Sequence, residues 1–485
     1  MGSPGRSRAV IAILVVSLVA VAAVAGFFAG RLSTEQSRTP ATTVPATTTL
    51  TVTASPRWTP PEKIRAAFIY VGPIGDYGWT YAHDLGRRVV AELFKDWLET
   101  TYVESVPEAK ALEEIDRLVK LGYNVIFTTS FEFMDATIEA SKRYPEVLFF
   151  HASGYKRSNN VGTYFADFYQ IYYLNGLMAG ALTKTGKIGY IAAFTIPEVV
   201  RHINAFAIGA REIGEQLGKN IEVYVVELGS WVAPEKAKAS AEYLVKNYNV
   251  DVIAFTEDTT AVVEFAQTYY KSTGKQLYVF SHYSPMYIYG PDVVVSGQLV
   301  RWEVIYADLL IKIRSGVLTP YNLANVDYWY LLNTGAVELG AHIYENGTVM
   351  KINPRFVPEL KGIKVKDKLT GEDVSAYELV LRRYEQMRSA PLLQPLQFSS
   401  LGHRYEHVDT IYIGGAEKSY KIAPLFEPFT GPLKGYCLVG GDTASSKFCK
   451  GKSKGSVVSI AAGERLTHDD LWSMDWFVEW VRYLG

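Results

Sequence analysis

From Ile64 onward, short apolar runs alternate with longer amphipathic stretches. The runs are rich in Val, Ile, Phe and Tyr and carry few alternating polar positions, which is typical of strands buried on both faces of a parallel sheet. The expected strands are 64–72, 98–106, 124–129, 147–153, 161–166, 187–194, 221–229, 251–257, 276–282 and 292–299. The stretches that separate or follow them predict helices at 78–97, 107–121, 167–184, 197–217, 233–248, 259–270 and 302–315.

Ten strands are many for one sheet, so the pattern favours two doubly wound α/β lobes joined by a hinge. A fresh strand follows Gly186, which places a boundary near 185. We expect lobe 1 to hold residues 63–185 and about 300–330, and lobe 2 to hold 186–299. In such folds ligands bind at the carboxyl ends of the strands, here in a cleft between the lobes.

Residues 331–485 predict a C-terminal extension that packs on the lobes. Within it, Cys437 and Cys449 favour a disulfide closing the loop 437–449, with two free thiols as the alternative. The stretch from Gly463 to Leu484 predicts a terminal helix that starts at the cap residue Thr467. On such a helix Trp472, Trp476 and Trp480 would share one packing face.

The N-terminus predicts export. Residues 9–30 contain no charge and would span about 33 Å as a helix, which is enough to cross a bilayer. Arg6 and Arg8 precede them, so we expect residues 1–32 to form a single-pass anchor with the folded part outside the cytoplasm. A cleaved signal peptide ending near Ala25 is the alternative. Residues 33–62 are rich in Thr and Pro and predict a stalk.

Composition narrows the functional class. The chain of 485 residues has a net charge of −1, which argues against nucleic acid as a partner. The sequence has no H-E-x-x-H and no G-x-S-x-G motif, and its histidines are scattered. We therefore expect no catalytic residues, no metal and no cofactor.

The stretch "YVGPIGDYGWTYAHD" joins the first expected strand to the first helix. Its glycines follow the pattern G-x-x-G-x-x-G, which is neither the dinucleotide fingerprint nor a P-loop. Asp76 and Trp79 lie at the expected start of the helix. They are either a helix cap and a packing residue, or contacts for a ligand in the cleft.

Other expected strand ends carry the same residue types. An aromatic ring can stack on a flat ligand, and a carboxylate accepts hydrogen bonds from hydroxyl or ring N–H groups. Taken singly these residues are typical of packing and capping, but their recurrence predicts a binding cleft. The further candidates are Ser130, Phe131, Asp135, Trp231, Asp258 and Tyr283.

Several stretches in matching order resemble the basic membrane protein (Bmp) family of substrate-binding proteins of ABC transporters. They are "YVGPIGDYGWTYAHDLGR", the segment from "TTSFEFMD" to "NGLMAG", "AAFTIPEVVRHINAFAIGAR", "GSWVAPEKAKASA" and "LWSMDWFVEWV". The resemblance covers about 64–335 and resumes near 425–482, and the family is similar to purine-nucleoside receptor lipoproteins. It implies a type I periplasmic-binding fold that delivers a ligand to a permease and an ATPase.

The resemblance also implies a nucleoside ligand, with aromatic rings on the base and acidic residues on the ribose. It assigns ligand contacts to Asp76, Trp79, Asp135, Trp231, Asp258 and Trp302. Two features depart from the family. Tyr283 stands where many relatives carry an acidic residue, and the apolar segment and stalk replace a lipidated cysteine.

These observations predict an extracytoplasmic solute-binding protein of an ABC importer that captures a small polar ligand, expected to be a nucleoside. A ligand-sensing receptor for a signalling partner is the alternative. A nucleoside-processing enzyme is a weaker one, because the sequence carries no metal cluster or cofactor loop.

Overall fold

The computed structural model describes residues 58–344, 347–389, 410–411, 420–421 and 426–485. The expected anchor at 9–30 lies outside these residues, as does most of the expected stalk. Within the described ranges, no helix is both long enough and apolar enough to cross a membrane. Residues 58–62, which the sequence assigns to the stalk, lie on lobe 1, where Arg314 donates hydrogen bonds to the carbonyls of Pro61 and Glu62.

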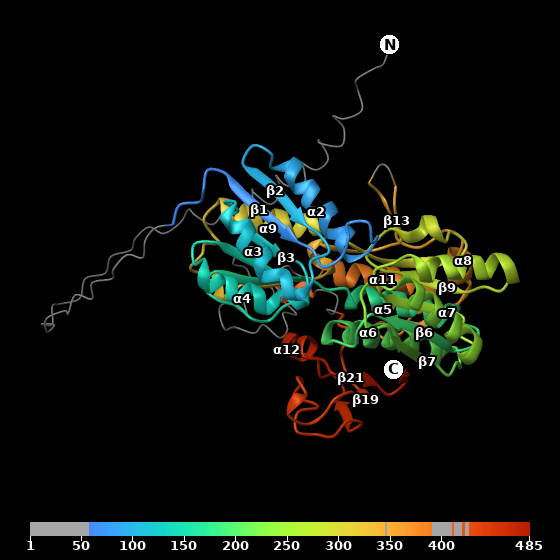
Figure 1. The fold of residues 1–485 in the computed structure, drawn as a ribbon. Helices are drawn as coiled ribbons and strands as arrows, with labels where there is room; N and C mark the ends of the chain where they lie inside the picture. Colours follow the sequence, from blue (N-terminus) through green and yellow to red (C-terminus); the bar gives the residue numbers. More distant parts are fainter. Residues whose placement is uncertain (1–57, 345–346, 390–409, 412–419, 422–425) are drawn as a thin grey trace, which may run out of the picture. The chain divides into compact units, whose positions relative to one another are not determined.

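Lobe 1 is built on a parallel sheet of six strands in the order β11-β5-β4-β3-β1-β2 (Figure 1). The strands are β1 Ile64–Ile69, β2 Leu98–Val103, β3 Val125–Thr128, β4 Leu148–Ala152, β5 Val161–Ala166 and β11 Asp327–Tyr330. The accompanying helices are α2 Trp79–Leu93, α3 Ala111–Lys120, α4 Met134–Arg143 and α9 Trp302–Arg314, with short 3₁₀ turns at Glu108–Lys110, Phe131–Phe133 and Leu323–Asn325. The inner strands β1, β3, β4 and β5 are almost wholly buried, as their continuous apolar runs predict.

Lobe 2 repeats this design in a sheet of seven strands, β12-β10-β9-β8-β6-β7-β22. The strands are β6 Lys187–Ala192, β7 Glu222–Glu227, β8 Val252–Thr256, β9 Tyr278–Ser281, β10 Val294–Val300, β12 Val337–Leu339 and β22 Val481–Tyr483. The helices are α5 Tyr169–Leu182, α6 Pro197–Gln216, α7 Pro234–Tyr248 and α8 Ala261–Thr273, with 3₁₀ turns at Met286–Tyr289 and Leu332–Thr334. In both lobes the first five strands follow the order 2-1-3-4-5, which places the ligand-binding edge at their carboxyl ends.

Helix α5 packs in lobe 2, although the sequence boundary near 185 would place it in lobe 1. All 14 of its residues are buried, and its glycines let the backbone of α6 approach closely. A Cβ on Gly176 would lie 2.1 Å from the carbonyl oxygen of Phe206, and one on Gly180 would lie 2.1 Å from that of Ala210. The chain therefore crosses between the lobes near Asp167. Because α5 is apolar on every side, its sequence has no polar face that could indicate its neighbours.

The predicted terminal helix is wrong beyond its first turns. Helix α12 is short, His468–Trp472, and begins with a capping box between Thr467 and Asp470. The chain then forms β21, Trp476–Val478, and β22, which pairs in parallel with β7 of lobe 2. The four-residue spacing of the tryptophans matches a helical face, but pairing with strands distant in sequence decides the structure.

The C-terminal part adds a small three-stranded sheet, β20-β19-β21, formed by β19 Leu433–Cys437, β20 Val457–Ile460 and β21. Cys437 and Cys449 are joined in a disulfide that closes the loop after β19. Residues 331–485 thus do more than pack on the lobes, because β12 and β22 are strands of the lobe 2 sheet.

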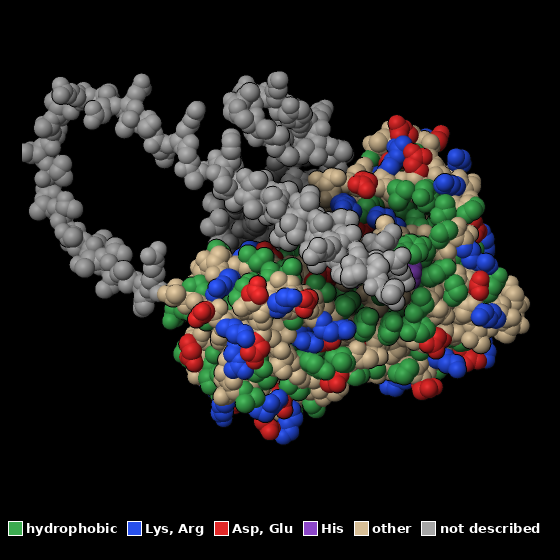
Figure 2. Space-filling model, turned by 90° about the horizontal axis from the view of Figure 1, so that it is seen from above, with side chains coloured by type: hydrophobic (Ala, Val, Ile, Leu, Met, Phe, Trp, Pro, Cys, Tyr) green, Lys and Arg blue, Asp and Glu red, His purple; other side chains and the backbone are tan. Residues whose placement is uncertain are grey.

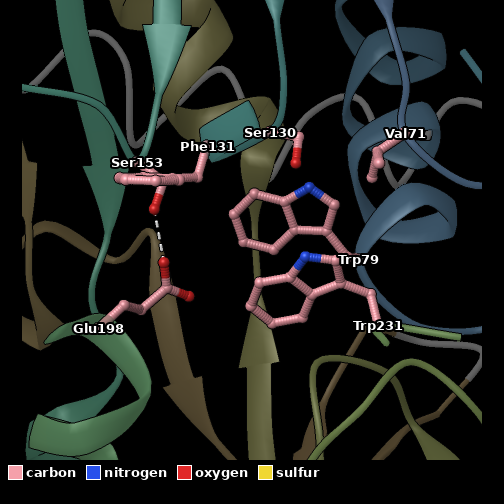
Figure 3. Close-up of a pocket in the computed structure, with 7 residues that line it drawn as sticks. All are labelled: Val71, Trp79, Ser130, Phe131, Ser153, Glu198 and Trp231. Atoms are coloured by element: carbon pink, nitrogen blue, oxygen red, sulfur yellow. Dashed lines mark hydrogen bonds between the residues drawn. The ribbon is translucent and has the colours of Figure 1, made fainter. Parts of the chain in front are cut away.

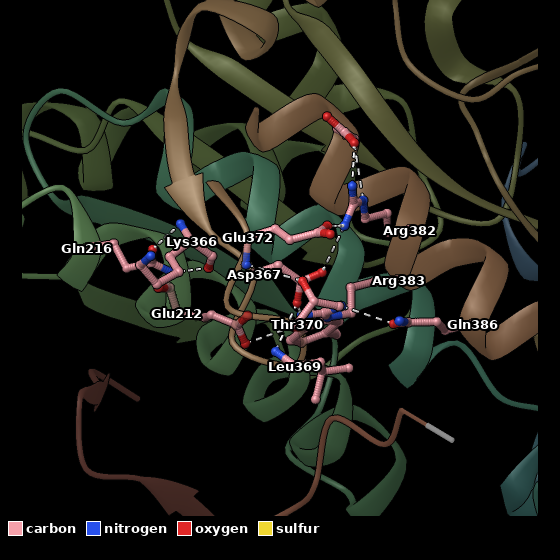
Figure 4. Close-up of polar contacts among 12 residues, drawn as sticks. Glu212, Gln216, Lys366, Asp367, Leu369, Thr370, Glu372, Arg382, Arg383 and Gln386 are labelled. Carbon is pink, nitrogen blue, oxygen red and sulfur yellow. Dashed lines mark hydrogen bonds and ion pairs between the residues drawn. The ribbon is translucent and has the colours of Figure 1, made fainter. Parts of the chain in front are cut away.

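Residues 349–388 tie the extension to lobe 2. Their elements are β14 Val349–Met350, α10 Val357–Gly362, β15 Lys364–Lys366, β16 Asp373–Ser375 and α11 Ala376–Arg388. Outside this segment, β13 His342–Ile343 pairs with β14, and β17 Thr410–Ile411 pairs with β18 Tyr420–Lys421. A fully buried ion pair joins Asp367 to Arg383 at 2.5 Å (Figure 4). Gln216 of α6 exchanges two hydrogen bonds with the backbone of Lys366. These contacts give the segment a structural role.

The surface mixes charge of both signs. On the face shown in Figure 2, Lys and Arg side chains alternate with Asp and Glu, and hydrophobic side chains lie among them. This arrangement agrees with the net charge of −1.

Candidate functional site

A small cavity lies between the lobes, where the carboxyl ends of several strands meet (Figure 3). Its volume is about 10 Å³, and the seven residues that line it include no Lys or Arg. The lining residues are Val71, Trp79, Ser130, Phe131 and Ser153 of lobe 1, and Glu198 and Trp231 of lobe 2. Three large rings and one carboxylate therefore surround the space.

The loop between β1 and α2 is organised by Asp76. Its carboxylate accepts hydrogen bonds from the backbone N–H groups of Gly78, Thr80 and Tyr81 at 2.8–2.9 Å, so it caps the first turn of α2. Gly78 is required for a different reason, since a Cβ there would lie 2.5 Å from the Cβ of Asp258 in lobe 2. The loop thus lies directly against the opposite lobe.

Trp79 connects the two lobes through its backbone and its ring. Its backbone N–H donates to the Oδ1 of Asp258 at 3.0 Å, and its indole N–H donates to the carbonyl of Thr129 at 2.5 Å. The rings that meet it edge-on are His83, Tyr283 and Trp302, with centroids 4.6, 5.3 and 5.4 Å away. Trp79 is therefore both a lining residue and part of the packed core.

Three buried carboxyl groups next to the cavity have raised pKa values. Burial raises the pKa of Asp258 well above its usual value, and the negative charge of Asp76 raises it further. Burial also raises the pKa of Asp76. The three backbone hydrogen bonds that its carboxylate accepts act in the opposite direction and lower this pKa, but the effect of burial is larger. Burial raises the pKa of Glu257 to about 8, although Thr259 donates to it. Near neutral pH, Glu257 is therefore largely protonated.

Glu198 forms a second link between the lobes. It lies in the first turn of α6, and its carboxylate accepts hydrogen bonds from Ser153 of lobe 1 at 2.5 Å and from the hydroxyl of Tyr283 at 3.2 Å (Figure 3 shows the Ser153 bond). Ser153 and Tyr283 have backbone φ angles of 64° and 57°, as does Tyr77 at 64°. Such left-handed conformations are unfavourable for these residue types and concentrate at functional sites.

The structure brings most of the predicted residues together. Four of them line the cavity: Trp79, Ser130, Phe131 and Trp231. Three more lie directly behind the lining: Asp76, Asp258 and Tyr283. Residues from strand ends of both lobes therefore lie around one cavity.

Two predicted residues lie elsewhere. The side chain of Asp135 is 78% exposed and forms an ion pair with Lys156 on the surface of lobe 1. Trp302 is fully buried behind Trp79 and stacks on His83, with centroids 3.8 Å apart. It supports the ring of Trp79 and does not line the cavity.

Three residues that line the cavity were not predicted from the sequence: Glu198, Ser153 and Val71. Glu198 follows Pro197 at the start of α6, where an acidic residue is typical of an ordinary helix N-terminus. Its role depends on a serine 45 residues earlier and a tyrosine 85 residues later. In the described part of the chain, no group of three or more His, Cys, Asp or Glu side chains is placed to hold a metal ion.

A family model matches residues 63–359, which include both sheets except β22. That family is Bmp, described as an ABC transporter substrate-binding protein, PnrA-like. The match includes all seven lining residues of the cavity.

Individual proteins agree with the family match. The chain is 35% identical over 279 residues to a purine-binding protein of Brucella abortus, a match that covers 57% of this chain and 75% of that protein. It is 33% identical over 255 residues to a putative ABC transporter glucose-binding protein of Haloferax volcanii, covering 53% and 62%. A solved solute-binding protein of an ABC transporter system from Aeropyrum pernix has the same fold, with a TM-score of 0.54 at 18% identity, covering 67% and 91%.

Proposed function

Because the chain belongs to the Bmp family of ABC transporter substrate-binding proteins, we propose that it captures a purine nucleoside between its two lobes. Members of this family are extracytoplasmic binding proteins that serve a permease and an ATPase, and they are not enzymes. The observation that carries the proposal is the set of three rings around one cavity, Trp79, Phe131 and Trp231, with the carboxylate of Glu198 beside them.

Each part of this set suits one part of a nucleoside. The rings come from both lobes, so closure would bring aromatic surface to both faces of a flat base. Glu198 and the hydroxyls of Ser130 and Ser153 would pair with ribose hydroxyls or base N–H groups. Asp258 and Asp76 would act from behind, by fixing the loop that carries Trp79. The similarity to the Brucella purine-binding protein supports the choice of base.

A hexose is the second candidate. The similarity to the Haloferax protein, which is named as a putative glucose-binding protein, favours it. An aromatic ring can also pack on the apolar face of a sugar, and carboxylates accept bonds from its hydroxyls. The two ligands would use the rings differently. A base is flat on both faces and can stack between two rings, whereas a sugar needs a ring on its apolar face only.

Binding requires the lobes to move apart. The cavity of about 10 Å³ is far smaller than the roughly 300–1,000 Å³ typical of ligand pockets. The Trp79–Asp258 and Ser153–Glu198 hydrogen bonds join the lobes across it. We infer that these bonds break on opening and that the ligand takes the place of the Ser153–Glu198 contact.

We also propose that residues 9–30 hold the protein at the membrane as a single-pass anchor. The 22 uncharged residues, preceded by Arg6 and Arg8, support this, as does the extracytoplasmic role of the family. The intact mass of the exported protein tests it, because removal of the segment as a signal peptide would shorten the chain.

Trp231 is the best residue for testing the site. Trp79 is 8% exposed and packed on four rings, so its truncation would also destabilise the fold by about 3 kcal/mol. Trp231 is half-buried and contacts one ring, that of Phe194. We expect Trp231→Ala in the full-length chain to raise the Kd for adenosine at least about tenfold in calorimetric titrations.

The matched control is Trp97→Ala, another half-buried tryptophan, which packs on Phe94 outside the cavity. It should leave the Kd unchanged. Equal affinities of wild type and Trp231→Ala would remove Trp231 from the site.

A further inference from the structure

Helix α2 carries an exposed apolar stripe on the face opposite its packed side. Tyr81, Leu85, Val89 and Leu93 are spaced by four residues, so they lie on one face of the helix. The side chains of Leu85, Val89 and Leu93 are 37%, 40% and 49% exposed. The other face is buried against α9, where Gly86 lies against Trp302. A surface helix is expected to be polar on its outer face, so a second apolar face requires an explanation.

The stripe continues to the seam between the lobes. Tyr77 stacks on Tyr81, with ring centroids 4.8 Å apart and planes at 7°. Tyr77 also meets Tyr289 of lobe 2 edge-on at 5.3 Å. Ile288, next to Tyr289, is 55% exposed. We call the seven residues Tyr77, Tyr81, Leu85, Val89, Leu93, Ile288 and Tyr289 the α2 surface.

The α2 surface includes residues of both lobes, and only one ring contact joins the two parts. Tyr77 directly follows Asp76 and precedes Gly78, the residue that lies against Asp258. Separation of the lobes at Asp258 would therefore also separate Tyr77 from Tyr289. The surface is continuous when the lobes are together and divided when they are apart.

We propose that the α2 surface docks on the extracytoplasmic face of the permease. A ligand can leave the cavity only where the lobes separate, so the partner that receives it must cover this seam. The α2 surface begins at the seam and is apolar, which suits the rim of a membrane-embedded protein better than an acidic or basic partner. Because the surface is continuous only when the lobes are together, docking on it distinguishes the closed protein from the open one.

This inference rests on the transport role of the family and does not depend on the identity of the ligand. The test is therefore made without added ligand. The full-length chain in lipid nanodiscs is titrated onto its immobilised permease–ATPase complex, and the Kd is measured by biolayer interferometry. We expect V89S combined with L93S to raise this Kd at least about tenfold.

The control replaces two exposed apolar residues of the C-terminal sheet region, V439S with V457S, whose side chains are 40% and 69% exposed. This variant should bind the complex like the wild type. Both variants should keep the wild-type unfolding temperature, because the replaced side chains are exposed.

Equal Kd values for wild type and the V89S/L93S variant would overturn the proposal. It would also be overturned if the wild type were a dimer in solution that these substitutions convert to a monomer, because a second copy would then cover the surface. Failure of adenosine to bind would leave this measurement unaffected.

Discussion

At the scale of single residues, the structure of the cleft depends on buried carboxyl groups. The residues that line the cavity include no Lys or Arg that could pair with them. Asp76 caps α2, Asp258 receives the backbone N–H of Trp79, and Glu198 joins Ser153 to Tyr283. Glu257 is fully buried, and its carboxyl group accepts hydrogen bonds from the hydroxyl of Thr259. Burial raises the pKa values of Asp76, Asp258 and Glu257, so their ionisation lowers the stability of the fold as the pH rises.

Glu257 provides a pH test. Its pKa is raised from 4.5 to about 8, so the folded state holds a proton that the unfolded state loses above pH 4.5. Its contribution to stability is therefore full below about pH 4.5 and is lost as the pH rises to about 8. We expect the wild type to lose about 1–3 kcal/mol more unfolding free energy between pH 5 and 8 than Glu257→Gln does. Urea denaturation at both pH values measures this, and identical losses would show that Glu257 is not the group responsible.

The sequence predicted the residue types of the site better than their individual roles. Asp76, Trp79 and Asp258 follow strand ends, and strand ends of parallel sheets meet at one edge. Asp135 also follows a strand end, but its position on α4 turns its side chain toward Lys156 and solvent. Glu198 could not be distinguished from a helix N-terminal acid, because its partners are distant in sequence.

At the scale of elements, the apolar runs predicted β1 to β10 within a few residues, which are ten of the thirteen strands in the two lobe sheets. The short strands β11, β12 and β22 were not predicted. The errors lie where local pattern and tertiary contacts disagree. Helix α5 has no polar face, so its lobe could not be predicted. The segment 476–483 has a helical spacing of tryptophans, but it forms β21 and β22 because β19 and β7 offer strands to pair with.

The disulfide gives a prediction at this scale. It links Cys437, the last residue of β19, to Cys449, which is twelve residues later in the chain, and both cysteines are buried. Closing a loop of this length reduces the entropy of the unfolded chain, so Cys437→Ser with Cys449→Ser should cost about 3 kcal/mol. Urea denaturation of the full-length chain measures the loss. Reductant should destabilise the wild type by a similar amount and leave the stability of the double variant unchanged. If reductant destabilised both proteins equally, the loss of stability would not come from this disulfide.

At the scale of the whole molecule, two lobes of the same strand order meet over a cavity that is too small for a nucleoside. Interlobe contacts are made by the Trp79 loop, by Ser153 with Glu198, and by Tyr77 with Tyr289. The same movement that admits a ligand would break all three and divide the α2 surface. Capture of a ligand and recognition by the permease would then depend on one motion.

We propose that this cleft selects a purine nucleoside over a sugar. Isothermal titration of the full-length wild-type chain with adenosine, guanosine and glucose tests it most directly. We expect at least one of the two nucleosides to bind with a Kd at least about a hundredfold lower than that of glucose, because only a flat base uses rings on both faces. Binding of glucose with no heat from either nucleoside would contradict this selectivity.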